Sequence, residues 1–244
     1  MNHLMTNGLI TKQVALQLLT NAAKLLSMAY VMGIVNCLAD ERALSQLSAE
    51  QQQQQLPDVG FDVVPLNLSL AWIVDSAAIL QYVLVALHCL WTRRLYVLAL
   101  FFEMHAAILV LRCLLVASTV LPSPLACTNR DLVLQEQEWS LLLRPMLHFM
   151  QSGSMLSWCH DFMFSGHTAA LVLATLTHFE LGSSLLWTIT ALLLTVSGIY
   201  VLLATRAHYT IDIVVACIVV PLLFQLYKPR LQTRPTQVPL KVAV

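Results

Sequence analysis

Long apolar runs separated by short polar connections make up most of this chain. A helix needs about 20 mostly apolar residues to cross a lipid bilayer. Six runs come near or above this length, at residues 14–38, 66–90, 95–120, 162–180, 184–205 and 211–227. The fourth and sixth runs are short and begin with polar residues. The pattern predicts an all-α, polytopic membrane protein with six transmembrane helices.

The composition excludes two other classes of protein. Of the 244 residues, 58% are hydrophobic and 11% are charged, and the mean hydropathy is +0.74. A soluble domain is roughly 45–50% apolar and about 25% charged. This chain therefore lacks the polar surface that a soluble core needs, and it is too apolar to be disordered. Its 13 basic and 13 acidic residues cancel without forming a basic stripe, so no nucleic-acid partner is expected.

The distribution of Lys and Arg predicts that both termini are cytosolic, because positive residues favour the inner side of a membrane. With the N-terminus inside, seven of them fall in inner segments and four in outer segments. The inner residues are Lys12, Arg93, Arg94, Lys228, Arg230, Arg234 and Lys241, and the outer residues are Arg42, Arg130, Arg144 and Arg206.

Three regions follow from this pattern. Residues 1–55 hold the first transmembrane helix and a Gln-rich spacer, residues 56–227 form the main membrane domain, and residues 228–244 are a basic, flexible tail. The first apolar run is too long for the core of a signal peptide, so we expect it to be retained.

A polar turn, Ser165-Gly166-His167, opens the fourth apolar run. Backbone N–H groups at a helix start, a glycine that lets a ligand approach and a hydroxyl group together make an anion site. A histidine there can exchange a proton with a phosphate ester. Read by itself, the turn also fits a plain N-cap, with Ser165 capping the helix and His167 at the membrane interface.

A histidine and an aspartate stand four residues apart at the start of the sixth run, in the segment Arg206-Ala207-His208-Tyr209-Thr210-Ile211-Asp212. Residues at this spacing share one face of a helix. A carboxylate in that position can orient an imidazole and stabilise its charged form. Taken alone, such pairs are common on helix surfaces.

The predicted topology brings the two motifs together. The chain crosses the membrane twice between His167 and His208, so both histidines return to the outer face. Asp212, Ser165 and Arg206 converge there with them. Ionisable groups in a membrane are costly and usually functional, so we predict a catalytic site that binds a phosphate group.

Two further ionisable residues lie within apolar runs. Asp75 falls roughly 15 Å from the outer end of the second run, where burying a carboxylate costs about 2.5–3.5 kcal/mol. It can orient His167 or pair with Lys24 of the first run, and the sequence leaves both open. Arg112, near the outer end of the third run, has a guanidinium group that suits a lipid phosphate, although it can also snorkel to the headgroups.

Neither a metal nor another cofactor is expected, because the chain has no CxxC pair and no Cys/His spacing typical of a zinc site. Cys127 and Cys159 share the second outer connection, where an oxidising lumen would let them pair.

Together the two motifs resemble those of the type-2 phosphatidic acid phosphatase superfamily. The usual lipid phosphatases of that superfamily carry a proline where this chain has Phe164, and a Lys-x6-Arg-Pro element that this chain lacks. These departures count against simple phosphomonoester hydrolysis.

The chain is more similar to the sphingomyelin synthase family, over residues 56 to about 227. That family's third motif resembles Cys-Gly-Asp-x3-Ser-Gly-His-Thr, and its fourth resembles His-Tyr-Thr-x-Asp. The matching residues are Cys159, Asp161, Ser165, Gly166, His167 and Thr168, then His208, Tyr209, Thr210 and Asp212. Leu56-Pro57-Asp58 with Phe61-Asp62 resembles the first motif, and Asp75 stands where the family carries a membrane glutamate. His160 replaces the glycine of the third motif.

The resemblance implies a six-span enzyme that transfers a phospho-headgroup from a glycerophospholipid to the primary hydroxyl of ceramide. It implies that His208 attacks the phosphorus while Asp212 orients it, and that His167 acts as acid and then as base. It further implies that Asp161 and Asp75 position the histidines. Phosphate binding would fall to Ser165, Gly166, Arg112 and Arg206. Choline, ethanolamine and inositol headgroups all remain open.

Two alternatives use the same residues differently. Water reaching the phosphohistidine would make the protein a phospholipase C or a lipid phosphatase. A non-catalytic lipid-binding or scramblase-like protein would tolerate loss of the histidines. The outward-facing site suits a reaction on the lumenal or exoplasmic face of the Golgi or plasma membrane, with the endoplasmic reticulum and homo-oligomerisation left open.

Overall fold

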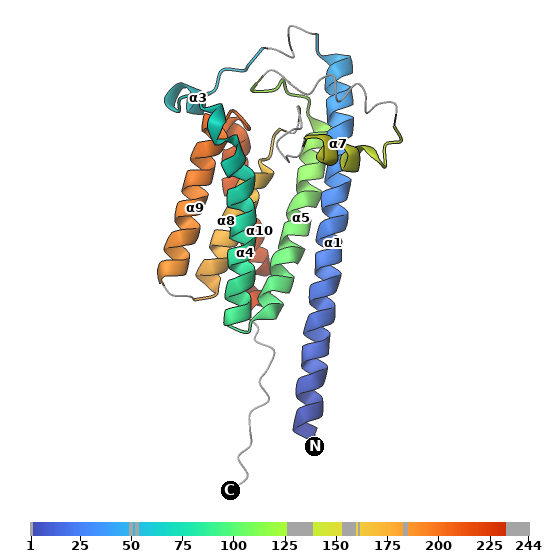
Figure 1. The fold of residues 1–244 in the computed structure, drawn as a ribbon, viewed down its shortest axis with the longest axis vertical. Coiled ribbons are helices and arrows are strands. Elements are labelled where there is room, and N and C mark those ends of the chain that lie inside the picture. The colour runs from blue at the N-terminus through green and yellow to red at the C-terminus, as the bar shows by residue number, and fades with distance from the viewer. Residues whose placement is uncertain are drawn as a thin grey trace.

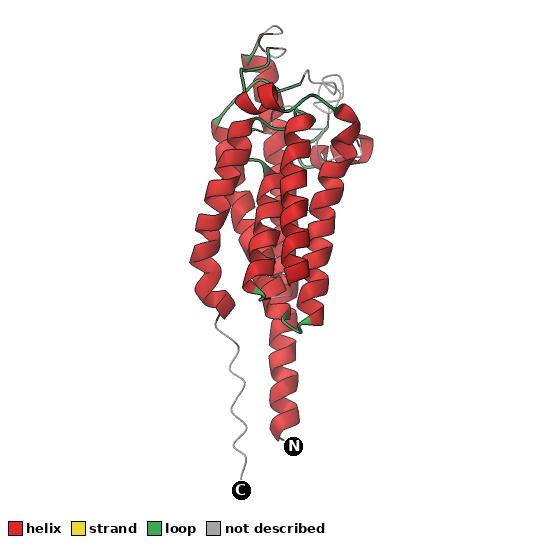
Figure 2. Ribbon diagram, turned by 90° about the vertical axis from the view of Figure 1, so that its left-hand side faces the viewer, coloured by secondary structure: helices red, strands yellow, loops and turns green. Residues whose placement is uncertain are grey.

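A computed structural model describes residues 2–48, 51, 54–125, 139–152, 160, 162–182 and 185–232, with the side chains of 2–11, 149, 151 and 152 left aside. Within these ranges the secondary structure is helical, joined by loops and turns (Figure 2). The all-α prediction is therefore confirmed for the described part of the chain.

The described helices follow one another along the chain with short connections. Their bounds are α1 Asn2–Gln46, α3 Val59–Val63, the 3-10 helix η1 Leu68–Leu70, α4 Ala71–Trp91, α5 Leu95–Ser118, α7 Arg144–Ser152, α8 Gly166–Glu180, α9 Leu185–Ala204 and α10 Thr210–Gln232.

The long helices run side by side along one axis (Figure 1). Helix α1 begins and α10 ends toward the same end of the bundle, and α3 lies at the opposite end. The starts of α4, α8 and α10 are at the end that carries α3. The segments before α8 and α10, which carry the two histidine motifs, therefore return to one end of the bundle, as the sequence predicted.

Within the described residues, five helices are long and apolar enough to cross a membrane, namely Lys12–Gln46, Leu68–Trp91, Leu95–Ser118, Leu185–Ala204 and Thr210–Gln232. The fourth predicted span, 162–180, is helical over Gly166–Glu180, which is 15 residues. At 1.5 Å per residue, α8 is about 22 Å long, short of a hydrocarbon core of about 30 Å. Six spans are therefore not confirmed by helix length.

Two other boundaries differ from the predicted ones. Helix α1 extends well beyond 14–38 at both ends, and α10 runs to Gln232, into the predicted flexible tail. Arg230 explains the extension of α10, because it forms a two-point ion pair with Glu103 of α5, at 2.7 and 3.0 Å.

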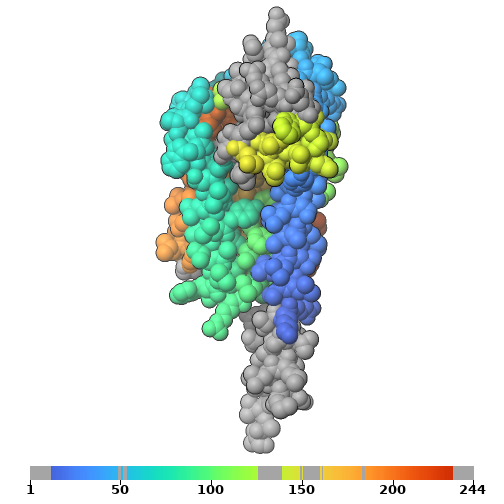
Figure 3. Space-filling view, turned by 45° about the vertical axis from the view of Figure 1, so that its right-hand side comes forward, coloured from blue at the N-terminus to red at the C-terminus, as the bar shows by residue number. Residues whose placement is uncertain are grey.

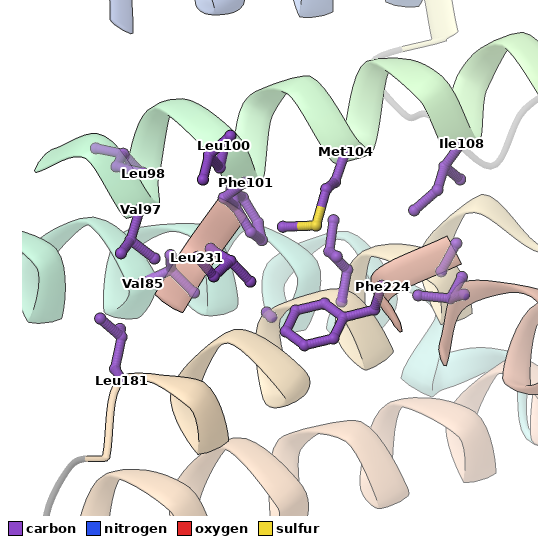
Figure 4. Close-up of a cluster of buried hydrophobic side chains, with 14 of the residues drawn as sticks. Val85, Val97, Leu98, Leu100, Phe101, Met104, Ile108, Leu181, Phe224 and Leu231 are labelled. Carbon is purple, nitrogen blue, oxygen red and sulfur yellow. The ribbon is translucent and has the colours of Figure 1, made fainter. Parts of the chain in front are cut away.

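Helix α8 lies inside the bundle and packs against α4, α5, α9 and α10. Small residues such as Ala169 and Ala174, both fully buried, let the neighbouring helices approach closely. Phe101, Met104 and Phe224 belong to the main apolar cluster between α4, α5, α8 and α10 (Figure 4). The helix that carries His167 is thus held on all sides by protein.

Helix α1 packs along α5 and is tied to it by polar side chains. Asn21 donates hydrogen bonds to the carbonyl of Ala99 and to Glu103, and Lys24 donates to Asn21. Helix α7 crosses the outer surface of α1 (Figure 3). The long first helix is therefore part of the bundle.

Candidate active site

The first turn of α10 is organised around the carboxylate of Asp212, which is fully buried. One oxygen, Oδ2, accepts from the backbone N–H of Tyr209 at 3.0 Å and faces Nδ1 of His208 at 3.3 Å. The other, Oδ1, accepts from the backbone N–H of Met163 at 2.8 Å. The i, i+4 pairing predicted from the sequence is present, and the same carboxylate also holds the segment before α8.

Helix α8 begins at the polar turn, as expected. Ser165 is its N-cap, and its hydroxyl oxygen accepts from the backbone N–H of Thr168 at 3.2 Å. The backbone N–H of Ser165 donates to the carbonyl of Asp212 at 3.2 Å. Met163 just before has a φ of 81°, a left-handed conformation that costs a non-glycine residue about 1 kcal/mol. Its hydrogen bond to Asp212 compensates for that strain.

His167 is paired with Asp75 across the bundle. Its Nε2 lies 2.8 Å from Oδ1 of Asp75 on α4. The sequence left Asp75 between His167 and Lys24, and the structure places it with His167. The other ring nitrogen, Nδ1, is buried and has no hydrogen-bond partner among the described residues. It is the nitrogen that a substrate can engage.

The two histidines lie next to one another. Their ring centroids are 6.2 Å apart, with an angle of 53° between the ring planes. Each ring is oriented by its own aspartate on one side, and Phe162 meets His208 edge-on. Since Asp212 engages Nδ1 of His208, Nε2 is the nitrogen of that ring available for attack on a ligand.

Arg112 of α5 is buried and reaches the start of α8. Its Nε donates to the carbonyl of Phe164 at 3.1 Å. A β-carbon at position 166 would overlap the guanidinium group, with Cζ only 2.8 Å away. A larger residue at this position would displace the guanidinium group from its place against the helix start. A cation and the N-terminal amides of α8 thus share one place, which suits an anionic group.

Arg206 has different contacts from those we expected of a phosphate ligand. Its guanidinium donates to the carbonyls of Phe61 and Val64, both at 2.9 Å, and to that of Leu203 at 2.7 Å. It also lies over the ring of Phe61, 4.3 Å from the centroid. These contacts fix α3 against the end of α9, and phosphate binding by Arg206 stays a prediction.

Asp58 also contributes to the site. In the sequence it stood out only because Leu56-Pro57-Asp58 resembles a family motif. It caps α3 by accepting from the backbone N–H groups of Gly60 and Phe61, at 2.9 and 3.2 Å. It also accepts from the backbone N–H of Thr210 at 2.7 Å, and from the Thr210 hydroxyl. The first outer loop therefore holds the start of α10, directly beside His208 and Asp212.

His160 stands where the family motif has glycine and is engaged with α1. Its Nδ1 lies 3.0 Å from Oδ1 of Asp40, and both side chains are buried. The pair joins α1 to the segment that leads into α8. Asp161, which the resemblance made a positioning residue, lies outside the described residues, as do Cys127 and Cys159.

No group of three or more His, Cys, Asp or Glu residues that could hold a metal ion occurs in the described part of the chain. The functional groups gathered at this end of the bundle are two histidines, two carboxylates and a guanidinium group, beside the start of α8.

Comparison with known proteins finds relatives that contain the same region. Residues 158–229 match the family model described as "PAP2 superfamily C-terminal". Phosphatidylcholine:ceramide cholinephosphotransferase 1 of Homo sapiens is 29% identical over 195 residues, covering 73% of this chain and 45% of that protein. Over most of its own length, the chain is thus similar to this ceramide phosphotransferase.

Two trypanosome proteins that are similar to the chain differ in the headgroup that their names state. Phosphatidylethanolamine:ceramide ethanolaminephosphotransferase of Trypanosoma brucei brucei is 29% identical over 118 residues, which is 48% of this chain and 35% of that protein. Phosphatidylinositol:ceramide inositolphosphotransferase of Trypanosoma cruzi is 41% identical over 66 residues, which is 26% of this chain and 20% of that protein. The chain spans less than half the length of each of these three relatives.

Replacing Asp58 with alanine tests its role at the start of α10. Asp58→Ala removes the carboxylate that accepts hydrogen bonds from the first turns of α3 and α10. We therefore expect the free energy of unfolding to fall by about 1–2 kcal/mol, with a lower midpoint of thermal unfolding in detergent. Asp62→Ala, an exposed carboxylate of the same loop, is the matched control and should leave the midpoint unchanged. Equal midpoints for both variants would show that Asp58 does not hold α10.

Proposed function

We propose that this protein transfers a phospho-headgroup from a glycerophospholipid to the primary hydroxyl of ceramide and releases diacylglycerol. One observation carries the proposal: two histidines, each hydrogen-bonded to its own aspartate, lie with ring centroids 6.2 Å apart at one end of the bundle. One imidazole can act as nucleophile while its neighbour moves the proton. The names of the relatives, which are phosphotransferases acting on ceramide, support the same reaction.

The first step forms a covalent intermediate. Nε2 of His208 attacks the phosphorus of the donor, and the bond from phosphorus to the diacylglycerol oxygen breaks. His167 gives its proton to that departing oxygen. Asp212 stabilises the positive charge that develops on His208. The product of this step is a phosphohistidine that carries the headgroup.

The second step returns both histidines to their starting states. His167, now neutral, takes the proton from the primary hydroxyl of ceramide. The ceramide oxygen attacks the phosphorus, and the bond to Nε2 of His208 breaks. Asp75 holds the His167 ring in one orientation through both steps. One acid–base group is thus used twice.

The anionic phosphate needs positive groups in both steps. We assign this role to Arg112, which lies against Gly166, together with Ser165 and the first backbone amides of α8. Donors that are already in position stabilise charge in the transition state without having to reorganise.

Two tryptophans support a membrane placement with the site near one surface. Trp72 and Trp91, at the two ends of α4, are 70% and 85% exposed. They lie about 28 Å apart along the helix, close to the thickness of a hydrocarbon core, and tryptophan favours the membrane interfaces. Asp75 then lies about one turn below the interface marked by Trp72, shallower than the sequence predicted, because α4 begins at Ala71.

The membrane topology belongs to the same proposal. Six helices cross or enter the bilayer, with α8 as a short sixth one enclosed by its neighbours. Both termini face the cytosol, and the site faces the lumenal or exoplasmic side. The Golgi or plasma membrane suits such a site.

A lipid assay tests both the donor and the acceptor. The purified protein receives labelled ceramide with phosphatidylcholine, phosphatidylethanolamine or phosphatidylinositol in separate reactions. We expect one donor to give the corresponding phosphosphingolipid and an equal amount of diacylglycerol. Without ceramide, diacylglycerol release should fall sharply, because a transferase excludes water from its intermediate. Undiminished release without ceramide would identify a phospholipase C instead.

The pairing of Asp75 with His167 predicts a charge requirement at position 75. Asp75→Asn keeps a polar side chain but loses the carboxylate, so we expect kcat to fall about 10- to 100-fold. This is part of the total contribution of general acid–base catalysis, which is about 10²–10⁴-fold. Asp75→Glu restores the charge found in the family and should retain most of the activity. If Asp75→Asn is as active as the unaltered protein, Asp75 does not assist His167.

A further inference from the structure

We propose that residues 139–152, which include α7, form a membrane-binding element at the outer interface of the bilayer, with apolar side chains inserted among phospholipids. We call this segment the interfacial segment. The proposal goes beyond the transfer chemistry, and it rests on the membrane placement and orientation given under the proposed function.

The interfacial segment exposes large apolar side chains. Leu142, Met146 and Met150 are 64%, 53% and 72% exposed, and Trp139 and Leu143 are about half exposed. Leu143, Met146 and Met150 are spaced three and four residues apart, so they share one face of a helix. An apolar face on a helix that lies across a bundle is the pattern of an interfacial helix.

The opposite face of the interfacial segment is fixed to α1. Pro145 packs so closely on Gly33 that a β-carbon on that glycine would lie 2.7 Å from Pro145 Cβ. Arg144 pairs with Glu41, and the hydroxyl of Tyr30 donates to the carbonyl of Leu142. His148 is fully buried. The exposed apolar face therefore points away from the protein, and the charge of Arg144 is already paired.

A chain of contacts places the interfacial segment at the depth of the active site. Asp75 lies about one turn below Trp72 and contacts His167, and the neighbouring Gly166 contacts Arg112 of α5. The next residue of α5, Cys113, lies 3.5 Å from Met32 of α1, sulfur to sulfur. Gly33, which follows Met32, carries the contact with Pro145 of α7.

The figures agree with this placement. Helix α7 lies across α1 at about the height where α4 begins (Figure 1). From the side, the segment lies on the surface over α1 (Figure 3). A helix at this depth, lying across the bundle axis, lies in the plane of the membrane interface.

Phospholipid is the occupant that fits this face. The apolar face continues onto α1, where Tyr30, Val31 and Leu38 are also exposed, at the depth where lipid surrounds the bundle. Trp139, at the start of the segment, is a residue that favours the headgroup region. Long, flexible methionine side chains adapt to a disordered partner.

Photo-crosslinking tests the proposal in the full-length protein. A benzophenone amino acid replaces Met146 or Met150, one at a time, in protein reconstituted into phosphatidylcholine vesicles. We expect irradiation to add the mass of one phosphatidylcholine at either position. The same probe at Leu193, a 63% exposed position on α9, is the positive control, and the probe at Asp62 of the outer loop is the negative control.

Two results would overturn the proposal. Lipid adducts at Met146 and Met150 as scarce as those at Asp62 would place the segment in water. A covalent dimer in place of lipid adducts would show that a second copy of the chain covers this face. Neither readout depends on enzyme activity, so failure of this proposal can be distinguished from failure of the proposed transfer reaction.

Discussion

The site depends on the carboxylate of Asp212. A charged group at a fully buried position costs several kcal/mol unless its oxygens are hydrogen-bonded, and here three donors surround it. Two belong to the turn that carries His208. The third is the backbone N–H of Met163, in the segment that leads into α8 and His167. One side chain therefore orients the proposed nucleophile and holds the second histidine's segment beside it.

In the proposed membrane placement, the depth of the site follows from the shortness of α8. Its 15 residues do not reach across a hydrocarbon core, so its first turn can lie below the membrane surface. Neighbouring helices enclose α8, which lets polar groups such as Ser165, Arg112 and the first amides be satisfied without contact with lipid. Non-helical backbone at this depth, over residues 162–165, is tolerated because it is enclosed by protein. A phosphate group held by a lipid at the interface would then meet both histidines.

The sequence predicted an all-α fold and the i, i+4 pair of His208 and Asp212. It also predicted that the two histidine motifs return to the same end of the bundle. Short-range spacing and hydropathy carry that information. Hydropathy extended the fourth span to residue 162, because Phe162, Met163 and Phe164 are apolar whether they are helical or not, whereas α8 begins at Gly166. Asp58 at the start of α10, Arg206 on the carbonyls of α3, and His160 with Asp40 were also missed. Each is a contact between residues that are far apart in sequence or depends on where a loop folds back.

The proposed reaction passes through a covalent intermediate on His208, and trapping that intermediate tests the reaction. The purified protein is incubated with its donor phospholipid, labelled at the headgroup phosphate, in the absence of ceramide, and is then quenched at alkaline pH and digested. We expect an acid-labile label on the peptide that contains His208, which ceramide added before the quench transfers to lipid product. If ceramide is converted to product while the enzyme carries no label, or if the label persists in His208→Ala, the reaction does not pass through a phosphohistidine at position 208.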